Sequence, residues 1–312
     1  MTISCVEPLG ISKERFEQLK NHYSGMGHAF NYYLDRDERT ETLVERMSGA
    51  DIVVVSNIRL PREVLEQCPT LKYLSVAFTG LDHIDLDYCR QNGIEVQNAA
   101  GYSTTAVSEL AVGMMIDLMR QVTRMDGLIR DGKGRGSFFG RELRGKTVGV
   151  VGTGAIGTAT IRLLLAFGCK VLAYNRSRHA EVEAMGVEYV ELDQLLRLSD
   201  IVTLHVPMCA ETKGMISRER LRLMKPTALL VNTARGHVCD IPAVADALKE
   251  GVIAGAAFDV FEQEPPLPAD HPLLSAPNCM LTPHIAFATE ESFAERADIV
   301  FNHVDDYLNK SL

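Results

Sequence analysis

The sequence predicts an α/β protein with two doubly wound parallel sheets, and three observations support this prediction. With 312 residues, the chain exceeds the length at which a single hydrophobic core is usual. Short apolar runs alternate with segments of helical spacing along most of the chain, which is the rhythm of βαβ units. One such run leads directly into glycines spaced G-x-G-x-x-G, at Gly152, Gly154 and Gly157.

The first hundred residues supply the strands of the first sheet. Residues 52–56, 71–76 and 94–96 are short apolar runs typical of strands. A short helix is expected at 61–68, because a proline stands at its first position. This alternation predicts one domain with a parallel sheet.

The longest uninterrupted helix is predicted at residues 103–130, where apolar residues recur at helical spacing. Its middle, 111–116, is apolar almost all round, so we expect burial on more than one face. Two interpretations remain open. The segment is either a core helix or a helix that packs part of its surface on a second subunit.

A second sheet is predicted after the glycine-rich segment 132–145. Six strands with helical crossovers are expected, which is the number in a doubly wound dinucleotide-binding sheet. A final helix is expected at 290–309. The expected strands are 146–151, 170–174, 201–205, 228–232, 253–257 and 280–282, and helices are expected at 158–167 and 241–250.

Each glycine of the motif has a physical role in a strand–turn–helix unit. The first allows the tight turn, the second lets the backbone approach a pyrophosphate, and the third lets the helix pack closely on the strand. The start of the following helix adds free N–H groups and the positive end of the helix dipole. The sequence therefore predicts a dinucleotide site, formed at this loop by Gly152, Gly154, Ala155, Ile156 and Gly157.

The second strand of this unit is followed by Asn175, where an NAD-binding protein commonly has an acidic residue for the ribose 2′-hydroxyl. Arg176, Ser177 and Arg178 come next. Loss of the carboxylate removes repulsion against a 2′-phosphate, and a guanidinium binds phosphate through two parallel hydrogen bonds. We therefore expect NADP(H) as the cofactor. NAD(H) is the alternative, because the arginines can be ordinary surface charges and Asn175 can still bond the ribose.

Three polar residues stand just beyond the carboxyl ends of apolar strands: Arg235, Glu264 and His284. Ligands of open α/β sheets bind at that edge. Each residue alone has an ordinary structural explanation, as a surface charge or a turn residue. Their joint placement predicts a polar site at the edge of the second sheet.

Composition excludes several classes of protein. The net charge of −9, with no concentrated basic face, argues against a nucleic-acid partner. No apolar run reaches the length of a membrane span, and no export signal is visible at the start. Seven scattered cysteines without a C-x-x-C pair suit reduced thiols rather than disulfides or zinc, so we expect a cytoplasmic protein without a metal.

Taken together, these motifs resemble the D-isomer-specific 2-hydroxyacid dehydrogenase family over nearly the whole chain. One departure is that the tryptophan common in the family's linker region is absent, since the chain contains none. The shared segments keep the family's order and similar spacing. They are 79–85 (TGLDHID), 205–207 (HVP), 211–212 (ET), 232–236 (NTARG), 257–265 (AFDVFEQEP) and 282–286 (TPHIA), in addition to the glycine motif.

The resemblance implies an oxidoreductase that transfers a hydride between a nicotinamide cofactor and a small D-2-hydroxy acid or 2-keto acid, such as glyoxylate, hydroxypyruvate or pyruvate. It implies that His284 is the general acid and base, that Glu264 bonds its ring, and that Arg235 clamps the substrate carboxylate. The alternative is a catalytically silent protein of the same fold that senses NAD(P) and binds partners. The presence of all three residues counts against it.

The resemblance also implies the domain bounds and further contacts. A Rossmann domain, residues 101–286, is inserted into a smaller flavodoxin-like substrate domain made of 1–100 and 287–312. A homodimer is expected. In the substrate domain, the backbone N–H groups of Thr79 and Gly80 cradle the carboxylate, while Phe78 and Tyr102 are candidates for the pocket wall or for the core. Further cofactor contacts are implied for Thr105, His205, Val206, Pro207, Thr212, Thr233, Ala234 and Asp259, the last with a strand-end cap as its alternative.

Overall fold

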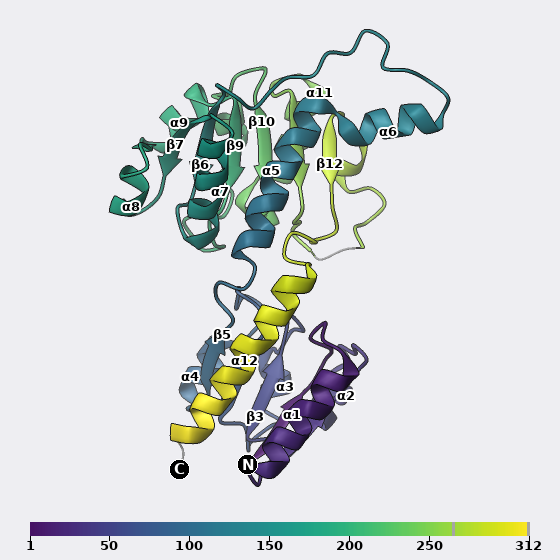
Figure 1. The fold of residues 1–312 in the computed structure, drawn as a ribbon, viewed down its shortest axis with the longest axis vertical. Coiled ribbons are helices and arrows are strands. Elements are labelled where there is room, and N and C mark those ends of the chain that lie inside the picture. Colours follow the sequence, from purple (N-terminus) through teal and green to yellow (C-terminus); the bar gives the residue numbers. More distant parts are fainter. Residues whose placement is uncertain (264–265, 311–312) are drawn as a thin grey trace. The chain divides into compact units, whose positions relative to one another are not determined.

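The computed structural model describes residues 1–263 and 266–310, and the chain divides into two compact units. One unit comprises Met1–Ser103 with Ala288–Leu312, and the other comprises Thr104–Phe287. Each unit contains one sheet in which all the described strand pairs are parallel, together with helices that connect the strands (Figure 1). The predicted fold class, two parallel-sheet α/β domains, is confirmed.

The first unit contains a five-stranded sheet of order β2-β1-β3-β4-β5. This is the flavodoxin-like order, in which the direction of winding reverses between β1 and β3. Val53, Val54 and their neighbours in β3 are fully buried, as expected for a central parallel strand covered on both faces. The strands are β1 (Thr2–Cys5), β2 (Ala29–Tyr32), β3 (Ile52–Val55), β4 (Tyr73–Val76) and β5 (Glu95–Asn98).

The last helix, α12 (Glu290–Lys310), returns to the first unit and packs on its sheet. The hydroxyl of Ser75 in β4 donates to the carbonyl of Val300 at 3.0 Å, and Phe301 lies against Tyr23 and Phe30. The described residues contain no helix with both the length and the apolarity needed to cross a bilayer. The other helices of this unit are α1 (Lys13–Gly25), α2 (Thr40–Met47), α3 (Arg62–Leu65) and α4 (Leu86–Gln91).

The second unit contains a seven-stranded sheet of order β12-β11-β10-β9-β6-β7-β8. Counted from β6, this is the Rossmann order 3-2-1-4-5-6 with a seventh strand added at one edge. The prediction of six strands was wrong by one, because the two-residue strand β8 is too short to leave a pattern. The strands are β6 (Thr147–Val151), β7 (Lys170–Tyr174), β8 (Glu188–Tyr189), β9 (Ile201–Leu204), β10 (Leu229–Asn232), β11 (Gly255–Phe258) and β12 (Cys279–Leu281).

Both faces of this sheet are buried. In β10, Leu229 and Val231 join the core beneath α5 (Thr104–Arg120) and α7 (Ala155–Ala166), while Leu230 joins the core on the opposite face. This alternation follows from the two-residue period of a strand. The opposite face is covered by helices that include α9 (Leu192–Leu198) and α11 (Ile241–Lys249).

The single helix predicted at 103–130 is in fact two helices, α5 and α6 (Val122–Arg130). The chain breaks at Gln121, whose φ of 50° lies in the left-handed region. Burial also differs between the two parts: α5 buries much of its surface, including Met114 and Met115, whereas α6 buries none of its residues. Apolar spacing continues across the break, so the pattern alone gave no sign of it.

Candidate functional site

The glycine loop lies where the winding of the second sheet reverses, between β6 and β9. Gly152 has a φ of +96°, and a Cβ there would lie 2.5 Å from the carbonyl oxygen of His205. A Cβ on Gly157 would lie 2.0 Å from the carbonyl oxygen of Gly152. By contrast, a Cβ on Gly154 would meet nothing within 4 Å. The outer glycines are therefore required by packing, and the middle one faces open space.

This loop has the features that a dinucleotide pyrophosphate needs. Gly154 is the N-cap of α7, which begins with Ala155 and Ile156, so the free N–H groups of a 12-residue helix start there. Two buried polar atoms at the ends of neighbouring strands, Nδ1 of His205 and Oγ1 of Thr233, have no hydrogen-bond partner among the described residues. An open backbone cradle beside unsatisfied polar atoms fits a bound dinucleotide.

The loop after β7 carries the residues predicted to read the ribose. The Asn175 side-chain amide donates to the carbonyl of Ser177 at 2.8 Å and lies 3.4 Å from Nε2 of His179. Arg178 is 3.7 Å from the Glu183 carboxylate, an exposed and weak ion pair. Arg176 is exposed. The pKa of Glu211 is lowered mainly by a hydrogen bond at Cys209 and by one to its own backbone, and the positive charge of Arg176 lowers it further. Arg178 is therefore paired with a carboxylate, and Arg176 is exposed.

The segment 205–212, which follows β9, is held by hydrogen bonds between its own residues. The hydroxyl of Thr212 donates to the carbonyl of Pro207 at 2.6 Å and accepts from the backbone N–H of Cys209 at 2.9 Å. Val206 is buried beneath this loop, and its side chain lies near the position that a Cβ on Gly152 would take. Burial lowers the pKa of His205 to about 4, so this imidazole is neutral at physiological pH.

Arg235 projects from a turn that Asn232 organises. The buried Asn232 side chain accepts from the backbone N–H of Ala234 at 3.0 Å and donates to the carbonyl of Arg235 at 2.9 Å. The next residue, Gly236, packs so tightly that a Cβ there would lie 2.1 Å from the backbone of Phe261. The turn that carries Arg235 is thereby wedged against the segment that follows β11.

His284 lies after β12, and its backbone is hydrogen-bonded to Asp259, which follows β11. Its backbone N–H donates to the carbonyl of Asp259 at 2.8 Å, and its ring stands edge-on to Phe287, with centroids 5.2 Å apart. The Asp259 carboxylate accepts from the N–H groups of Ile285 and Ala286, each at 2.8 Å, and from the hydroxyl of Thr282 at 2.6 Å. Asp259 therefore organises the loop that carries His284. Burial raises the pKa of this carboxyl, and those hydrogen bonds oppose the rise.

Arg235, Asp259 and His284 follow β10, β11 and β12, which are adjacent parallel strands. The sheet therefore brings all three to one edge, the same edge that carries the glycine loop. Glu264, the predicted partner of the His284 ring, lies outside the described residues. Thr105 is exposed in the first turn of α5.

In the first unit, Phe78, Thr79 and Gly80 follow β4 at the carboxyl edge of its sheet. Thr79 is exposed, and its carbonyl accepts from the Asn98 side chain. Phe78 and Tyr102 are 8% and 3% exposed. Tyr102 also lies under the guanidinium of Arg296, 5.6 Å from the ring centroid. These positions suit the core as well as a pocket wall, and their predicted contacts with substrate stay predictions.

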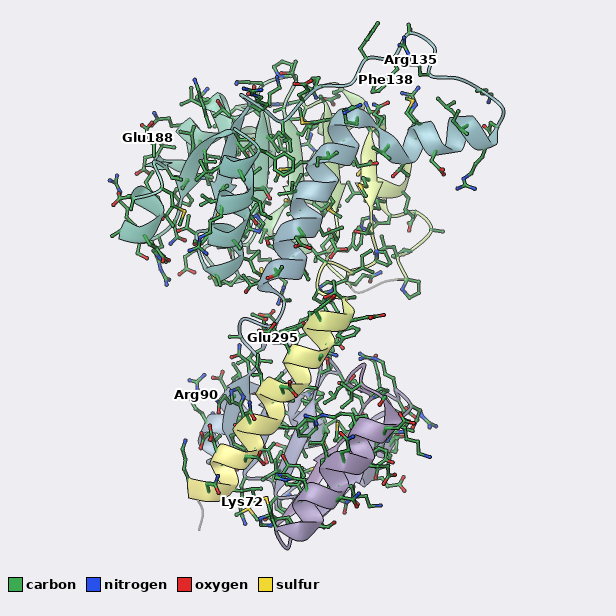
Figure 2. All side chains as sticks on the ribbon, viewed as in Figure 1. Lys72, Arg90, Arg135, Phe138, Glu188 and Glu295 are labelled. Carbon is green, nitrogen blue, oxygen red and sulfur yellow. The ribbon has the colours of Figure 1, made fainter. Side chains whose placement is uncertain are left out.

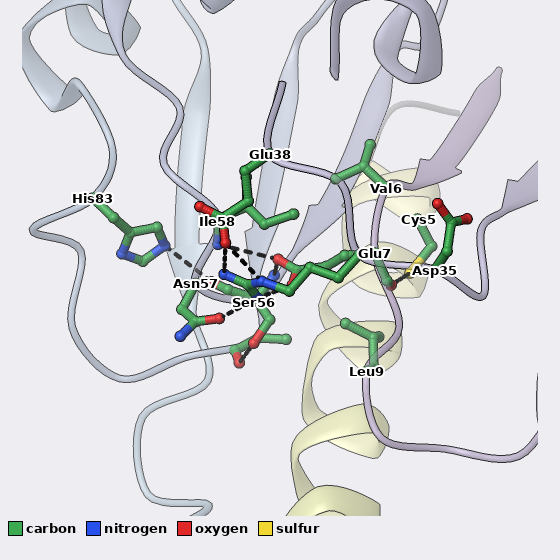
Figure 3. Close-up of polar contacts among 12 residues, drawn as sticks. Cys5, Val6, Glu7, Leu9, Asp35, Glu38, Ser56, Asn57, Ile58 and His83 are labelled. Carbon is green, nitrogen blue, oxygen red and sulfur yellow. Dashed lines mark hydrogen bonds and ion pairs between the residues drawn. The ribbon is translucent and has the colours of Figure 1, made fainter. Parts of the chain in front are cut away.

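Sequence reasoning missed a buried carboxylate in this unit, Glu7, which is 1% exposed. Figure 3 shows its polar contacts. It follows β1 and accepts from the backbone N–H of Ser56 at 2.7 Å and from the guanidinium of Arg36 at 2.6 Å. Arg296 of α12, also buried, donates to the Ser56 hydroxyl at 3.1 Å and to the carbonyl of Leu9 at 2.8 Å. The network ties together the chain segments after β1, β2 and β3. An acidic residue two positions after a buried strand was the available signal.

Comparison with known proteins identifies the family of this chain. The family model described as "D-isomer specific 2-hydroxyacid dehydrogenase, NAD binding domain" matches residues 112–286. The chain belongs to the D-isomer-specific 2-hydroxyacid dehydrogenase family. A glyoxylate reductase of Thermofilum pendens is 46% identical over 248 residues, which cover 77% of this chain and 73% of that protein.

Two further proteins align with more of this chain. A hydroxypyruvate reductase of Blautia hydrogenotrophica is 35% identical over 278 residues, covering 87% of this chain and 86% of that protein. Among solved structures, the acyclic imino acid reductase Bsp5 in complex with NADPH and D-arginine has a TM-score of 0.89 at 29% identity. That alignment covers 99% of this chain and 98% of the other. The chain is therefore a hydride-transfer oxidoreductase that acts on 2-hydroxy and 2-keto acids with a nicotinamide cofactor, and the alternative of a silent scaffold is not favoured.

Proposed function

We propose that this dehydrogenase reduces small 2-keto acids, with glyoxylate and hydroxypyruvate as the foremost substrates. The observation that carries the proposal is the placement of Arg235, Asp259 and His284 at the carboxyl ends of three adjacent strands, on the edge that carries the glycine loop. The relatives named glyoxylate reductase and hydroxypyruvate reductase support the choice of substrates.

The proposed chemistry divides the work between the cofactor and the chain. The nicotinamide supplies the hydride when it is bound. The Arg235 guanidinium offers a planar set of donors that matches a carboxylate and an adjacent carbonyl. His284 gives a proton to the keto oxygen in reduction and removes it in oxidation, because an imidazole can act in both directions near neutral pH. Asp259 fixes the backbone of the loop that presents His284. Glu264 is proposed to orient the His284 ring.

The test of this proposal is a direct assay. Consumption of NADPH and of NADH is measured with glyoxylate, hydroxypyruvate, pyruvate and 2-keto acids with bulkier side chains. We expect the highest kcat/KM for glyoxylate or hydroxypyruvate. Failure to reduce any 2-keto acid, with cofactor binding intact, would overturn the proposal.

We also propose that the preferred cofactor is NADP(H), with NAD(H) as the weaker one. The support is Asn175 at the end of β7 and the exposed Arg176 beside it, in a loop without a carboxylate at that position. A charge-assisted hydrogen bond is worth about 1.5–3 kcal/mol, less when exposed to water. That corresponds to roughly a 10- to 100-fold lower KM for NADPH.

The cofactor proposal is tested by the double variant Asn175→Asp with Arg176→Ala. The new carboxylate repels a 2′-phosphate and bonds a ribose hydroxyl, so the preference should reverse toward NADH. Arg197→Ala is the matched control, since Arg197 is an exposed arginine on α9 of the same unit. If the wild type prefers NADH and the double variant keeps the same ratio, Arg176 is an ordinary surface charge.

A homodimer in the cytoplasm completes the proposal. Its support in the structure is the exposed apolar surface of α6 and the following loop, with Val122, Ile129 and Phe139 exposed by 54%, 71% and 80%. Beside them, a groove of about 760 Å³ runs along the edge strand β12. A second copy of the chain is the occupant that the family relationship favours. The seven cysteines are free thiols, which fits a reducing compartment.

A further inference from the structure

The hydroxyl of Tyr189, in the second unit, contacts both the glycine loop and the loop that follows β7. Tyr189 lies on the edge strand β8 and pairs with Ala173 of β7. Its hydroxyl oxygen is 2.8 Å from Oγ1 of Thr153 and 3.3 Å from the backbone nitrogen of His179. Thr153 belongs to the glycine loop, and His179 ends the loop that starts at Asn175. Tyr189 therefore bridges the loop for the pyrophosphate and the loop for the ribose.

The end of the bridge at the glycine loop is firmly held. Thr153 stands between Gly152 and Gly154 and is fully buried. Its carbonyl accepts from the hydroxyl of Thr158 at 3.0 Å, which ties it to the first turns of α7. The Thr153 side chain thus offers a fixed anchor to whatever bonds it.

The other end of the bridge attaches to the loop that carries Arg176. His179 is the N-cap of the short helix α8 (Ala180–Glu183), and its side chain is 3.4 Å from the Asn175 amide. That amide also donates to the carbonyl of Ser177. Residues 175–179 are therefore folded on themselves and attached at His179 to Tyr189. Arg176, the proposed partner of a 2′-phosphate, is exposed in the middle of this loop.

The chemistry of the groups sets the direction of each hydrogen bond. A backbone N–H can only donate, so the His179 amide donates to the phenol oxygen of Tyr189. The single proton of the phenol is then available for Oγ1 of Thr153. A phenylalanine at position 189 keeps the ring, which packs against the core, and removes both bonds.

We propose that Tyr189 is a positioning residue for the 2′-phosphate of the cofactor, because its hydroxyl holds the loop that carries Arg176 in register with the glycine loop. This inference rests on the proposed NADP(H) specificity. Arg176 gains most from a phosphate when the loop is already ordered, since ordering it on binding costs conformational entropy. Loss of the hydroxyl should weaken ligands with a 2′-phosphate more than ligands without one.

The experiment measures the affinity of two probes, 2′,5′-ADP and 5′-ADP, by isothermal titration calorimetry with the full chain. The variants are Tyr189→Phe, Thr153→Val and both together. Tyr189→Phe should weaken 2′,5′-ADP by roughly 3- to 10-fold, the usual worth of one or two neutral hydrogen bonds, and 5′-ADP by less. Thr153→Val should act in the same direction. The double variant should lose less than the product of the two single losses, because both remove one shared bond.

Tyr174→Phe is the matched control, because the structure gives its hydroxyl no hydrogen bond with the described residues although Tyr174 directly precedes the loop. It should bind both probes as the wild type does. Amide hydrogen exchange of residues 175–182 should rise in Tyr189→Phe and stay unchanged in Tyr174→Phe. This readout separates the inference from the proposal beneath it. A wild type that binds both probes equally removes the 2′-phosphate site, whereas unchanged exchange and unchanged affinity in Tyr189→Phe remove the positioning role.

Discussion

His284 occupies a backbone conformation that a histidine rarely adopts. Its φ is 54°, and among the described residues only Gln121 and Asn278 share a positive φ without being glycine. Such a conformation costs about 1–3 kcal/mol and persists only where the surroundings enforce it. Here the enforcement comes from Asp259, whose carboxylate accepts the two N–H groups that follow His284 and whose carbonyl accepts that of His284 itself. The arrangement aims a side chain at the expense of local strain, which is typical of functional sites.

The proposed proton transfer predicts a specific kinetic defect. His284→Gln should lower kcat by roughly 10²- to 10⁴-fold, the usual worth of general acid–base catalysis, with little change in cofactor affinity. Arg235→Lys should also reduce kcat/KM, because a point charge replaces a planar set of donors. Steady-state kinetics and cofactor titration check both. Near wild-type turnover in His284→Gln would assign the proton to another residue.

The neutral imidazole of His205 predicts how stability changes with pH. In the unfolded chain this group takes a proton near its ordinary pKa of 6.5, whereas burial lowers the folded pKa to about 4. Between these values the unfolded state binds more protons, so stability falls as the pH drops from 6.5 toward 4. Thermal unfolding midpoints of wild type should therefore decline more steeply over this range than those of His205→Gln.

The control for this measurement is His237→Gln, which changes an exposed histidine of the same unit. It should follow the wild-type slope. Parallel curves for the wild type and His205→Gln would mean that His205 does not contribute to the acid sensitivity of the fold.

At the residue scale, the sequence predicts the parts of the site that lie in motifs and misses those held by contacts between distant segments. Asn175, Arg235 and His284 could be found because each follows an apolar strand. Glu7 also follows a buried strand, but its hydrogen-bond partner Ser56 lies 49 residues away, and the partner of Tyr189, Thr153, lies 36 residues away, so the sequence did not show what either residue contacts. Glu264 was predicted from its motif, and its position lies outside the described residues.

At the element scale, α7 shows how one helix start can require glycine for two different reasons. A Cβ on Gly157 collides with the glycine loop, at 2.0 Å from the carbonyl oxygen of Gly152. A Cβ on Gly154 meets no protein atom within 4 Å, and its φ of −68° suits any residue. Gly157 is needed for the fold, and Gly154 is needed only if a ligand approaches the backbone.

This contrast predicts different effects on the unfolding midpoint for two alanine variants that both weaken cofactor binding. Gly157→Ala should lower the thermal unfolding midpoint and abolish cofactor binding together, because backbone must move. Gly154→Ala should leave the midpoint unchanged and weaken cofactor binding by about 10-fold or more, because the methyl group occupies the approach of the pyrophosphate. Calorimetric unfolding and cofactor titration distinguish the two. Unaltered cofactor affinity in Gly154→Ala would show that the pyrophosphate lies elsewhere.

The expected strands agree with the observed bounds to within two residues, whereas the helices expected at 61–68 and 158–167 differ from α3 and α7 by up to three residues. The strand expected at 170–174 is β7, and the helix expected at 290–309 is α12. The break at Gln121 had no glycine or proline to signal it, and apolar residues at helical spacing continue on both sides. Tertiary context decides such a position, because a left-handed glutamine is stable only where the neighbouring segments favour the turn.

At the scale of the whole molecule, α6 and the loop 131–145 are the part that the fold of one chain does not explain. They extend beyond the sheet of their own unit, and Arg135 and Phe138 lie on the loop that follows α6 (Figure 2). No residue of α6 is buried, and its apolar residues Val122 and Ile129 are exposed, so these two side chains gain little from the fold of one chain. The break at Gln121 directs α6 away from the core, and contact between the exposed face of α6 and a second copy of the chain would explain this direction.

The groove along β12 offers the complementary surface. It is lined by the end of α5, by residues of the 138–141 segment and by the last strand of the sheet, all within the second unit. A two-fold dimer requires one patch to contact its own copy, and a stable one buries about 1,200–2,000 Å² in total. An extended arm beside a groove of mixed polar and apolar lining provides both the surface and the means of reaching it.

The dimer is therefore the prediction to test on the whole molecule. Light scattering at micromolar concentration should give twice the chain mass of 34.4 kDa. Ile129→Asp and Phe139→Asp should shift the mass toward one chain, because a buried unpaired carboxylate opposes the interface. Leu198→Asp should not, since Leu198 is an exposed apolar residue at the end of α9, outside the arm and the groove. A wild-type mass near 34.4 kDa would remove the dimer and leave the exposed surface of α6 for another partner.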